Sequence, residues 1–176
     1  MRIYIVGYMG AGKSTSSKRL AHRLGMDFYD TDRLFENRYR ISVSDFFNKY
    51  DENLYRKLET NILQSTQEYD NAVIATGGGT ACFNDNMQWM NQHGLTVFLK
   101  VSPQTAFNRL SKSKVKRPLV TNKTPQELMD FIQVNYTERM SFYEQAMITI
   151  KGEDLDLDLL VNAIQNFNPP ASTPAE

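Results

Sequence analysis

Short apolar runs alternate with longer amphipathic stretches along this chain of 176 residues. The apolar runs predict strands at residues 2–6, 27–29, 72–75, 96–101 and 147–150. Between them, apolar residues recur at helical spacing and predict helices over residues 14–24, 31–40, 44–49, 53–68, 85–92, 103–110, 125–143 and 155–167. Strands that alternate with helices in this way indicate an α/β domain with a mostly parallel sheet.

The same pattern contains no internal repeat and no second group of elements, so we expect one domain over residues 1–167. The tail, residues 168–176, contains three prolines and little to pack, and we expect it to be disordered. Residues 111–123 are rich in lysine and poor in apolar side chains. This stretch predicts either a solvated surface loop or a mobile lid that brings positive charge over a phosphate.

The composition is typical of a globular protein, with 41% hydrophobic and 23% charged residues. Twenty basic residues balance twenty acidic ones, so no overall field favours nucleic acid or an anionic membrane as a partner. The single cysteine, Cys82, excludes an intrachain disulfide, and the two histidines lack metal-ligand spacing. Because the opening apolar run is too short for a signal peptide or a membrane span, we expect a cytoplasmic protein.

The strongest chemical signal is a phosphate-binding loop (P-loop) directly after the first predicted strand. Residues 7–14 read GYMGAGKS, a complete match to the pattern G-x-x-x-x-G-K-[ST]. Glycines let the backbone wrap closely around phosphate, Lys13 reaches the β- and γ-phosphates, and the Ser14 hydroxyl binds Mg²⁺. The position between a strand and a helix is the context that the motif requires. We therefore predict a nucleotide site formed by Gly10, Ala11, Gly12, Lys13, Ser14 and Thr15.

Two carboxylates follow the second predicted strand, at the edge where α/β sheets place their ligands. Alternate residues of an extended segment project the same way, so Asp30 and Asp32 can face one site. One could hold a Mg²⁺-bound water while the other accepts the proton of an attacking hydroxyl, which is the chemistry of a kinase. Alternatively, Asp30 only caps the following helix.

A glycine cluster follows the third predicted strand. Gly77, Gly78 and Gly79 leave bare backbone at the same edge of the sheet and could offer N–H groups to a polar substrate. A flexible turn would require the same residues. The sequence alone therefore leaves both readings open.

Arg139 lies in the middle of an otherwise apolar stripe on the helix predicted over residues 125–143. The other members of the stripe are Leu128, Ile132, Tyr136 and Tyr143. A buried guanidinium is costly without an anionic partner. Either a carboxylate side chain or a carboxylate ligand meets Arg139, or its side chain reaches out to water.

Taken in order along the chain, these motifs resemble those of the shikimate kinase family, small P-loop kinases with the nucleoside monophosphate kinase fold. The matching segments are GYMGAGKST at 7–15, DTD at 30–32, YRKLE at 55–59, TGGGT at 76–80, KRPL at 116–119 and ERMSFY at 138–143. The resemblance implies a three-layer α/β/α fold with a five-stranded, mostly parallel sheet, substrate-binding helices at about residues 31–68 and a lid at about residues 111–123.

The implied activity is transfer of the γ-phosphate of MgATP to the 3-hydroxyl of shikimate, in the biosynthesis of chorismate and aromatic amino acids. ATP is then the co-substrate, Mg²⁺ the cofactor and shikimate the small-molecule partner, and we expect a monomer. By the resemblance, Asp32 orients or deprotonates the attacking hydroxyl, and Asp30 lies near the water shell of Mg²⁺.

The resemblance also implies roles for four arginines. Arg56 and Arg139 bind the shikimate carboxylate, which suits the planar guanidinium. Arg117 stabilises the transferring phosphoryl group from the lid. Arg109 packs on the adenine, although a solvated helix end is the alternative.

For the remaining site residues, the resemblance implies supporting contacts to the acceptor. Glu59 supports Arg56, unless the two form an ordinary surface ion pair. Gly77, Gly78 and Gly79 line the acceptor, with N–H groups of the last two directed at it.

One position departs from the family pattern. Asp51 stands where a glycine is usual before the pair Tyr55–Arg56, and this could alter a turn or a hinge. Gluconate kinases and nucleoside monophosphate kinases share the fold and the P-loop, but the combination of DTD, YR, GGG and the lid RP argues against them. A non-catalytic nucleotide-binding regulator is the alternative from another class, and it would bind ATP with negligible turnover.

Overall fold

Parallel strands form a five-stranded sheet in the order β2-β3-β1-β4-β5. The structure is a computed structural model that describes residues 1–113, 120 and 122–167. The strands are β1 (Arg2–Val6), β2 (Asp27–Asp30), β3 (Ala72–Ala75), β4 (Leu95–Lys100) and β5 (Ile148–Lys151). The three central strands are almost wholly buried, as is typical of apolar runs covered on both faces. The mostly parallel sheet expected from the sequence is confirmed.

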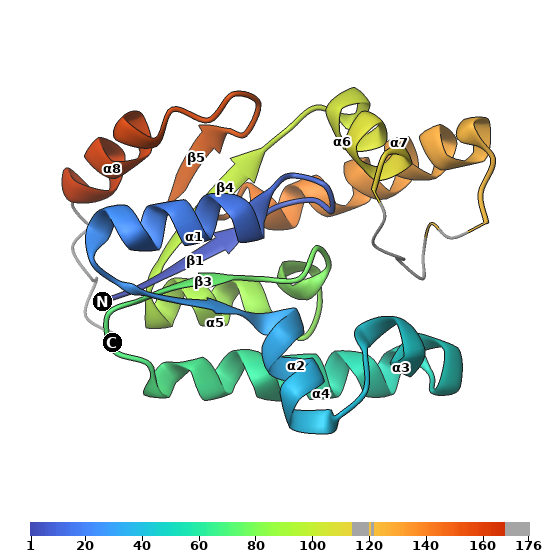
Figure 1. Cartoon of the computed structure of the whole chain (residues 1–176), viewed down its shortest axis with the longest axis horizontal. Coiled ribbons are helices and arrows are strands. Elements are labelled where there is room, and N and C mark those ends of the chain that lie inside the picture. Colours follow the sequence, from blue (N-terminus) through green and yellow to red (C-terminus); the bar gives the residue numbers. More distant parts are fainter. Residues whose placement is uncertain (114–119, 121, 168–176) are drawn as a thin grey trace, which may run out of the picture.

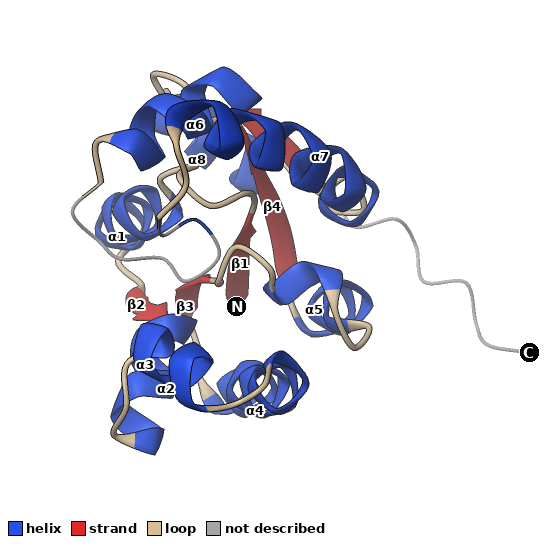
Figure 2. Cartoon of the chain, turned by 90° about the vertical axis from the view of Figure 1, so that its right-hand side faces the viewer, coloured by secondary structure: helices blue, strands red, loops and turns tan. Residues whose placement is uncertain are grey.

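Helices cover both faces of this sheet. Helices α1 (Lys13–Leu24) and α8 (Leu157–Gln165) pack together on one face. Helices α5 (Asn86–His93) and α7 (Pro125–Tyr143) lie on the opposite side, and α6 (Pro103–Ser111) packs on α7 (Figure 2). The result is the predicted three-layer α/β/α arrangement, with the carboxyl ends of all strands at one edge.

Three further helices form a separate group beside β2 and β3. They are α2 (Thr31–Tyr39), α3 (Val43–Lys49) and α4 (Glu52–Ser65), at the bottom of Figure 1. The three helices pack together through a small hydrophobic core, separate from the main one, made of Phe35, Phe46, Tyr55 and Ile62. This group provides one side of the pocket described below.

Predicted boundaries agree with the structure to within two residues, except at the end of the helix predicted over residues 53–68. The helix predicted over residues 53–68 ends as α4 at Ser65 and continues as a 3₁₀ turn, η1 (Thr66–Glu68). The helix predicted from residue 155 begins only after Asp156, whose carboxylate accepts from the N–H groups of Asp158 and Leu159. A second 3₁₀ turn, η2 (Thr80–Cys82), was not predicted.

One predicted segment and part of another lie outside the described residues. These are the tail at 168–176 and, within the expected lid, residues 114–119 and 121. In the part of the chain that is described, no helix is both long enough and apolar enough to cross a membrane.

Candidate active site

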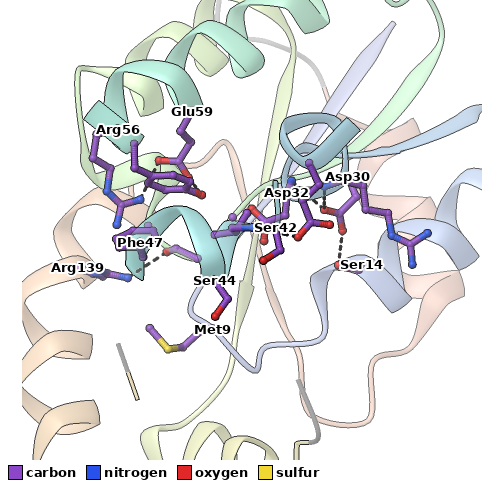
Figure 3. A pocket seen from close by; sticks show the side chains of 17 residues that line it. Met9, Ser14, Asp30, Asp32, Ser42, Ser44, Phe47, Arg56, Glu59 and Arg139 are labelled. Atoms are coloured by element: carbon purple, nitrogen blue, oxygen red, sulfur yellow. Dashed lines mark hydrogen bonds and ion pairs between the residues drawn. The ribbon is translucent and has the colours of Figure 1, made fainter. Parts of the chain in front are cut away.

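A cavity of about 480 Å³ opens at the carboxyl edge of the sheet, between the P-loop and the group formed by α2, α3 and α4. The residues that line it come from six separate segments of the chain. They are Met9, Ser14, Asp30, Asp32, Arg33, Glu36, Ser42, Val43, Ser44, Phe47, Tyr55, Arg56, Glu59, Gly77, Gly78, Gly79 and Arg139. Figure 3 shows Arg56 and Arg139 on one side of this pocket and Asp32, Asp30 and Ser14 on the other.

The P-loop joins β1 to α1. Gly10 and Gly12 have positive φ angles of 81° and 93°, which favour glycine, and Gly12 is the N-cap residue of α1. Lys13 is buried, and its Nζ donates to the carbonyl oxygens of Gly7 at 2.7 Å and Tyr8 at 3.0 Å. The first turn of α1 exposes Ser14 and Thr15 at the open side of the loop. An ammonium group and a helix N-terminus thus converge where the motif requires them for phosphate.

The two carboxylate oxygens of Asp30 have different partners. Oδ1 accepts from the N–H groups of Asp32 at 3.1 Å and Arg33 at 3.4 Å and so caps α2. Oδ2 accepts from the Ser14 hydroxyl at 2.6 Å. The capping role considered as an alternative is therefore confirmed, and it leaves the second oxygen beside the P-loop.

The Ser14 and Asp30 oxygens are the ligand type that Mg²⁺ prefers. Within the described ranges, no group of three or more His, Cys, Asp or Glu side chains could hold a metal ion. A cation at Ser14 and Asp30 would thus take most of its ligands from phosphate and water, as Mg²⁺ does in P-loop proteins. The residues present fit that ion.

The glycine cluster lies between the two sides of the pocket. A Cβ on Gly77 would lie 2.9 Å from the Asp32 carboxylate, and one on Gly79 would lie 2.8 Å from the Arg56 guanidinium. The N–H of Gly77 donates to the Thr31 hydroxyl at 3.1 Å, so it is not available to a substrate. The N–H groups of Gly78 and Gly79 donate to no acceptor within the described residues. Close packing, and not flexibility alone, explains the three glycines.

Arg56 projects from α4 and is 6% exposed. Its Nη1 donates to Glu59 at 2.8 Å, and its Nη2 donates to Glu52 at 2.9 Å. The Phe83 ring centroid lies 4.1 Å from the guanidinium carbon. Although burial works against the charge, the carboxylates of Glu59 and Glu52 raise the pKa of Arg56 above its ordinary value. The guanidinium is thereby fixed and remains charged.

Glu59 is 3% exposed, which excludes the surface ion pair considered as an alternative. Its Oε2 accepts from Arg56, while its Oε1 accepts from the Thr80 hydroxyl at 2.7 Å and the Tyr55 hydroxyl at 3.4 Å. Each oxygen of this buried carboxylate therefore has a donor. Glu59 thus pairs with Arg56 inside the protein, and its support of a substrate contact stays a prediction.

Arg139 has a different environment on α7. The buried residues of that helix are the stripe predicted from the sequence, namely Leu128, Ile132, Tyr136, Arg139 and Tyr143. Arg139 is 7% exposed, which leaves little of it in water, and its Nη1 lies 3.5 Å from the Gly78 carbonyl oxygen. No carboxylate of the described residues lies within 4.0 Å of it. Of the three alternatives, an anionic ligand is the one that these contacts favour.

Arg109 is exposed near the end of α6, and its guanidinium contacts three backbone carbonyls. Its Nη1 donates to the carbonyl oxygens of Gly10 at 3.1 Å and Ala11 at 2.8 Å, and its Nη2 donates to Gly152 at 3.5 Å. The guanidinium thus bridges the P-loop and the loop after β5 while it remains exposed, so the solvated helix end is not excluded. The predicted contact with adenine stays a prediction. Arg117 lies outside the described residues.

Several residues of the site were not found from the sequence. Glu52 stands one helical turn before Arg56 but just before the start of the predicted helix at residue 53, and a start one residue earlier would have revealed the pair. Phe83, Thr31 and Thr80 gave no such signal. Each reaches its partner across at least 20 residues of sequence, and only the fold brings them together.

Comparisons with known proteins agree on one family. The family model described as shikimate kinase matches residues 9–167. The shikimate kinase of Azobacteroides pseudotrichonymphae is 45% identical over 169 residues, which cover 96% of this chain and 98% of the relative. That of Phocaeicola vulgatus is 43% identical over 155 residues, covering 88% of this chain and 89% of the relative.

Solved structures give the same result. The shikimate kinase of Bacteroides thetaiotaomicron has a TM-score of 0.87 at 41% identity, and the match covers 94% of this chain and 96% of the other. The shikimate kinase of Acinetobacter baumannii, solved in complex with shikimate, has a TM-score of 0.81 at 32% identity over 94% and 93%. A deoxyadenosine kinase at 20% identity, with a TM-score of 0.59, shares the fold.

Proposed function

Since the chain belongs to the shikimate kinase family, we propose that it transfers the γ-phosphoryl group of ATP to the 3-hydroxyl of shikimate. The observation that carries the choice of acceptor is Arg139. This arginine is buried in the wall of the pocket, and no described carboxylate lies within ion-pair distance of it. A carboxylate ligand between Arg139 and Arg56 would compensate the charge and fix the acceptor bidentately.

The geometry supports an in-line transfer. With its carboxylate held by the arginines, the acceptor extends across the pocket towards Asp32 and the P-loop (Figure 3). A hydroxyl oxygen of the acceptor then attacks the γ-phosphorus, the bond to the β-phosphate oxygen breaks, and ADP leaves. The hydroxyl proton passes to the Asp32 carboxylate, which lines the pocket.

The phosphate side relies on groups already in place. Lys13 would exchange its contacts with the Gly7 and Tyr8 carbonyls for phosphate oxygens. Ser14 directly and Asp30 through a water would hold Mg²⁺, which neutralises phosphate charge when bound. Arg117 stays a prediction as the lid residue that stabilises the transferring group.

Several wider expectations belong to the same proposal. They are a monomeric, cytoplasmic enzyme of aromatic amino acid biosynthesis, with one kinase domain over residues 1–167, substrate-binding helices at about 31–68 and a lid at about 111–123. The family membership supports the activity, and the arrangement of α2, α3 and α4 beside the pocket supports the role of those helices.

The test is release of ADP from MgATP by the purified protein, with shikimate, gluconate, several nucleoside monophosphates or no acceptor. We expect turnover with shikimate alone, and ¹H–³¹P coupling in the product should place the phosphate on the 3-hydroxyl. Turnover with a nucleoside monophosphate, which has no carboxylate, would contradict the binding of an acceptor carboxylate by Arg56 and Arg139. Turnover with gluconate would contradict the choice of shikimate. Tight ATP binding without turnover on any acceptor would favour a nucleotide-binding regulator.

Lys13→Ala tests the phosphate side. We expect kcat to fall on the order of 1000-fold, because the ammonium group stabilises charge on the transferring phosphoryl group. Lys18→Ala, on the exposed face of the same helix, serves as the control and should keep kcat within about twofold. A Lys13→Ala enzyme with ordinary kcat would refute the P-loop assignment.

A further inference from the structure

Tyr143 is the last residue of α7 and is 0% exposed. Its ring stacks on Phe98 of β4, with ring centroids 5.3 Å apart. Its hydroxyl donates to the Gly78 carbonyl oxygen at 2.5 Å. A wholly buried tyrosine, one helical turn beyond Arg139, is thus bonded to the glycine cluster of the pocket.

The Gly78 carbonyl oxygen has a second donor, Nη1 of Arg139 at 3.5 Å. One carbonyl therefore joins the glycine cluster to the end of α7 through two side chains. The described part of the chain has no cis peptide bonds, so the N–H of Gly79 points opposite to the Gly78 carbonyl. Fixing that carbonyl against α7 fixes the direction of the Gly79 N–H as well.

The glycine cluster has little room to move. A Cβ on Gly78 would lie 3.1 Å from the Met9 backbone nitrogen, and one on Gly79 would lie 2.8 Å from the Arg56 guanidinium. A small rotation of this peptide would press on Arg56 and alter the contact with Arg139 together. The orientation of the peptide between Gly78 and Gly79 therefore affects the positions of both Arg56 and Arg139.

We propose that Tyr143 is a positioning residue for acceptor binding, which holds the Gly78 carbonyl so that Arg139 and the Gly79 N–H meet the acceptor in a fixed geometry. The inference deepens the proposed function and rests on it. Without the hydroxyl, the buried carbonyl would retain only its long contact with Arg139 and would draw that guanidinium away from the ligand. Burial raises the pKa of Tyr143 well above its ordinary value, so the hydroxyl stays a donor at neutral pH.

The chain offers a matched control on the same helix. Tyr136 is 8% exposed, and its hydroxyl donates to the Val101 carbonyl oxygen at 2.7 Å, away from the acceptor pocket. Tyr136→Phe and Tyr143→Phe therefore each remove one buried hydroxyl from a backbone carbonyl. Only the second change alters the glycine cluster.

The experiment compares both variants with the wild type by KM for shikimate, KM for ATP, kcat and melting temperature. For Tyr143→Phe we expect a KM for shikimate about tenfold higher, as for the loss of one hydrogen bond to a buried group, and a KM for ATP within about twofold. For Tyr136→Phe we expect both KM values within about twofold, with a similar change of melting temperature. An unchanged KM for shikimate in Tyr143→Phe, or an equal rise in Tyr136→Phe, would overturn the proposal.

A second measurement separates positioning from packing. With the methyl ester of shikimate, which lacks the negative charge, the penalty of Tyr143→Phe should shrink to about twofold, because Arg139 no longer meets an anion. An equal penalty for acid and ester would overturn the link through Arg139. If Tyr143→Phe does not fold, Arg139→Ala in the wild-type background must reduce the preference for acid over ester, with Arg56 still present, and an undiminished preference would overturn the link through Arg139.

The wild-type measurement keeps the two proposals distinguishable. A wild type that neither binds nor phosphorylates shikimate would refute the proposed function and this inference with it. A wild type that phosphorylates shikimate, paired with an unaffected Tyr143→Phe variant, would refute the inference alone.

Discussion

The α4 wall and the α7 wall of the pocket each present one buried arginine, and the two differ in what surrounds the charge. Arg56 on α4 is paired with two carboxylates, Glu59 and Glu52, and lies against the Phe83 ring. Arg139 on α7 has a backbone carbonyl at 3.5 Å and no described carboxylate within 4.0 Å. The two arginines are equally buried, but among the described residues only Arg56 has carboxylates that compensate its charge.

Because of this difference, the contribution of a buried arginine to stability can be measured separately from its contribution to acceptor binding. Removing one member of a buried ion pair leaves the other charge uncompensated, which destabilises the fold. Removing a buried charge that has no protein partner relieves a desolvation cost instead. We therefore expect Arg56 to matter for stability and for acceptor binding, and Arg139 to matter for acceptor binding.

The largest effect is expected for Arg56→Met. The free energy of unfolding should fall by about 3–5 kcal/mol, because Glu59 would remain buried with only the hydroxyls of Thr80 and Tyr55 as partners. Denaturation with urea, followed by circular dichroism, measures this change.

The double variant Arg56→Met/Glu59→Gln is the control for that prediction. Replacing both charges should recover most of the lost stability, while the KM for shikimate stays high because the clamp has lost an arginine. If Arg56→Met alone leaves the unfolding free energy unchanged, the buried pair does not stabilise the α4 wall, and the contrast between the walls fails.

Arg139→Met should show the opposite combination. We expect a KM for shikimate on the order of 100-fold higher, the loss expected when a buried charged hydrogen-bond partner is removed. The unfolding free energy should change by less than about 1 kcal/mol. Steady-state kinetics and urea denaturation of one preparation provide both values.

The outcome for Arg139→Met can contradict the comparison in either direction. An unchanged KM would remove Arg139 from the clamp. A loss of stability as large as that of Arg56→Met would mean that a charge outside the described residues compensates Arg139 in the absence of ligand.

The two walls were not equally predictable from sequence. Arg139 could be found by periodicity alone, because a charged residue interrupts an apolar stripe whose members are all buried in α7. The P-loop could be found for a similar reason, since its residues are contiguous and act mainly through local backbone. In both regions the informative residues lie within a few turns of one another.

The α4 wall depends on contacts that are distant in sequence. The Thr80 hydroxyl reaches Glu59, and the Phe83 ring reaches Arg56, only because η2 folds back against α4. The sequence resemblance placed Glu59 behind Arg56, but no spacing rule shows that this pair is buried. The same limit applies to the two roles of Asp30, because its contact with Ser14 is a property of the assembled sheet edge.

The smallest effect is expected at the start of α4, where the chain departs from its family. Asp51 is the N-cap residue, and its carboxylate accepts from the Leu54 N–H at 2.8 Å. Asp51→Ala should lower the unfolding free energy by about 1 kcal/mol, whereas Asp51→Gly, which installs the usual family residue, should cost only a few tenths, about as expected for N-caps in general. Thr124→Ala, at the matching position of α7, should cost about as much as Asp51→Ala.

These cap variants also test how rigidly the α4 wall holds Arg56. The contacts of Arg56 with Glu59 and Phe83 lie beyond the first turn and do not involve the cap, so we expect the KM for shikimate to stay within about twofold in both Asp51 variants. A several-fold rise in Asp51→Gly would show that the cap, and not the buried pair, sets the position of the guanidinium. In that event, Asp51 would be the residue by which this chain adjusts its acceptor pocket relative to its family.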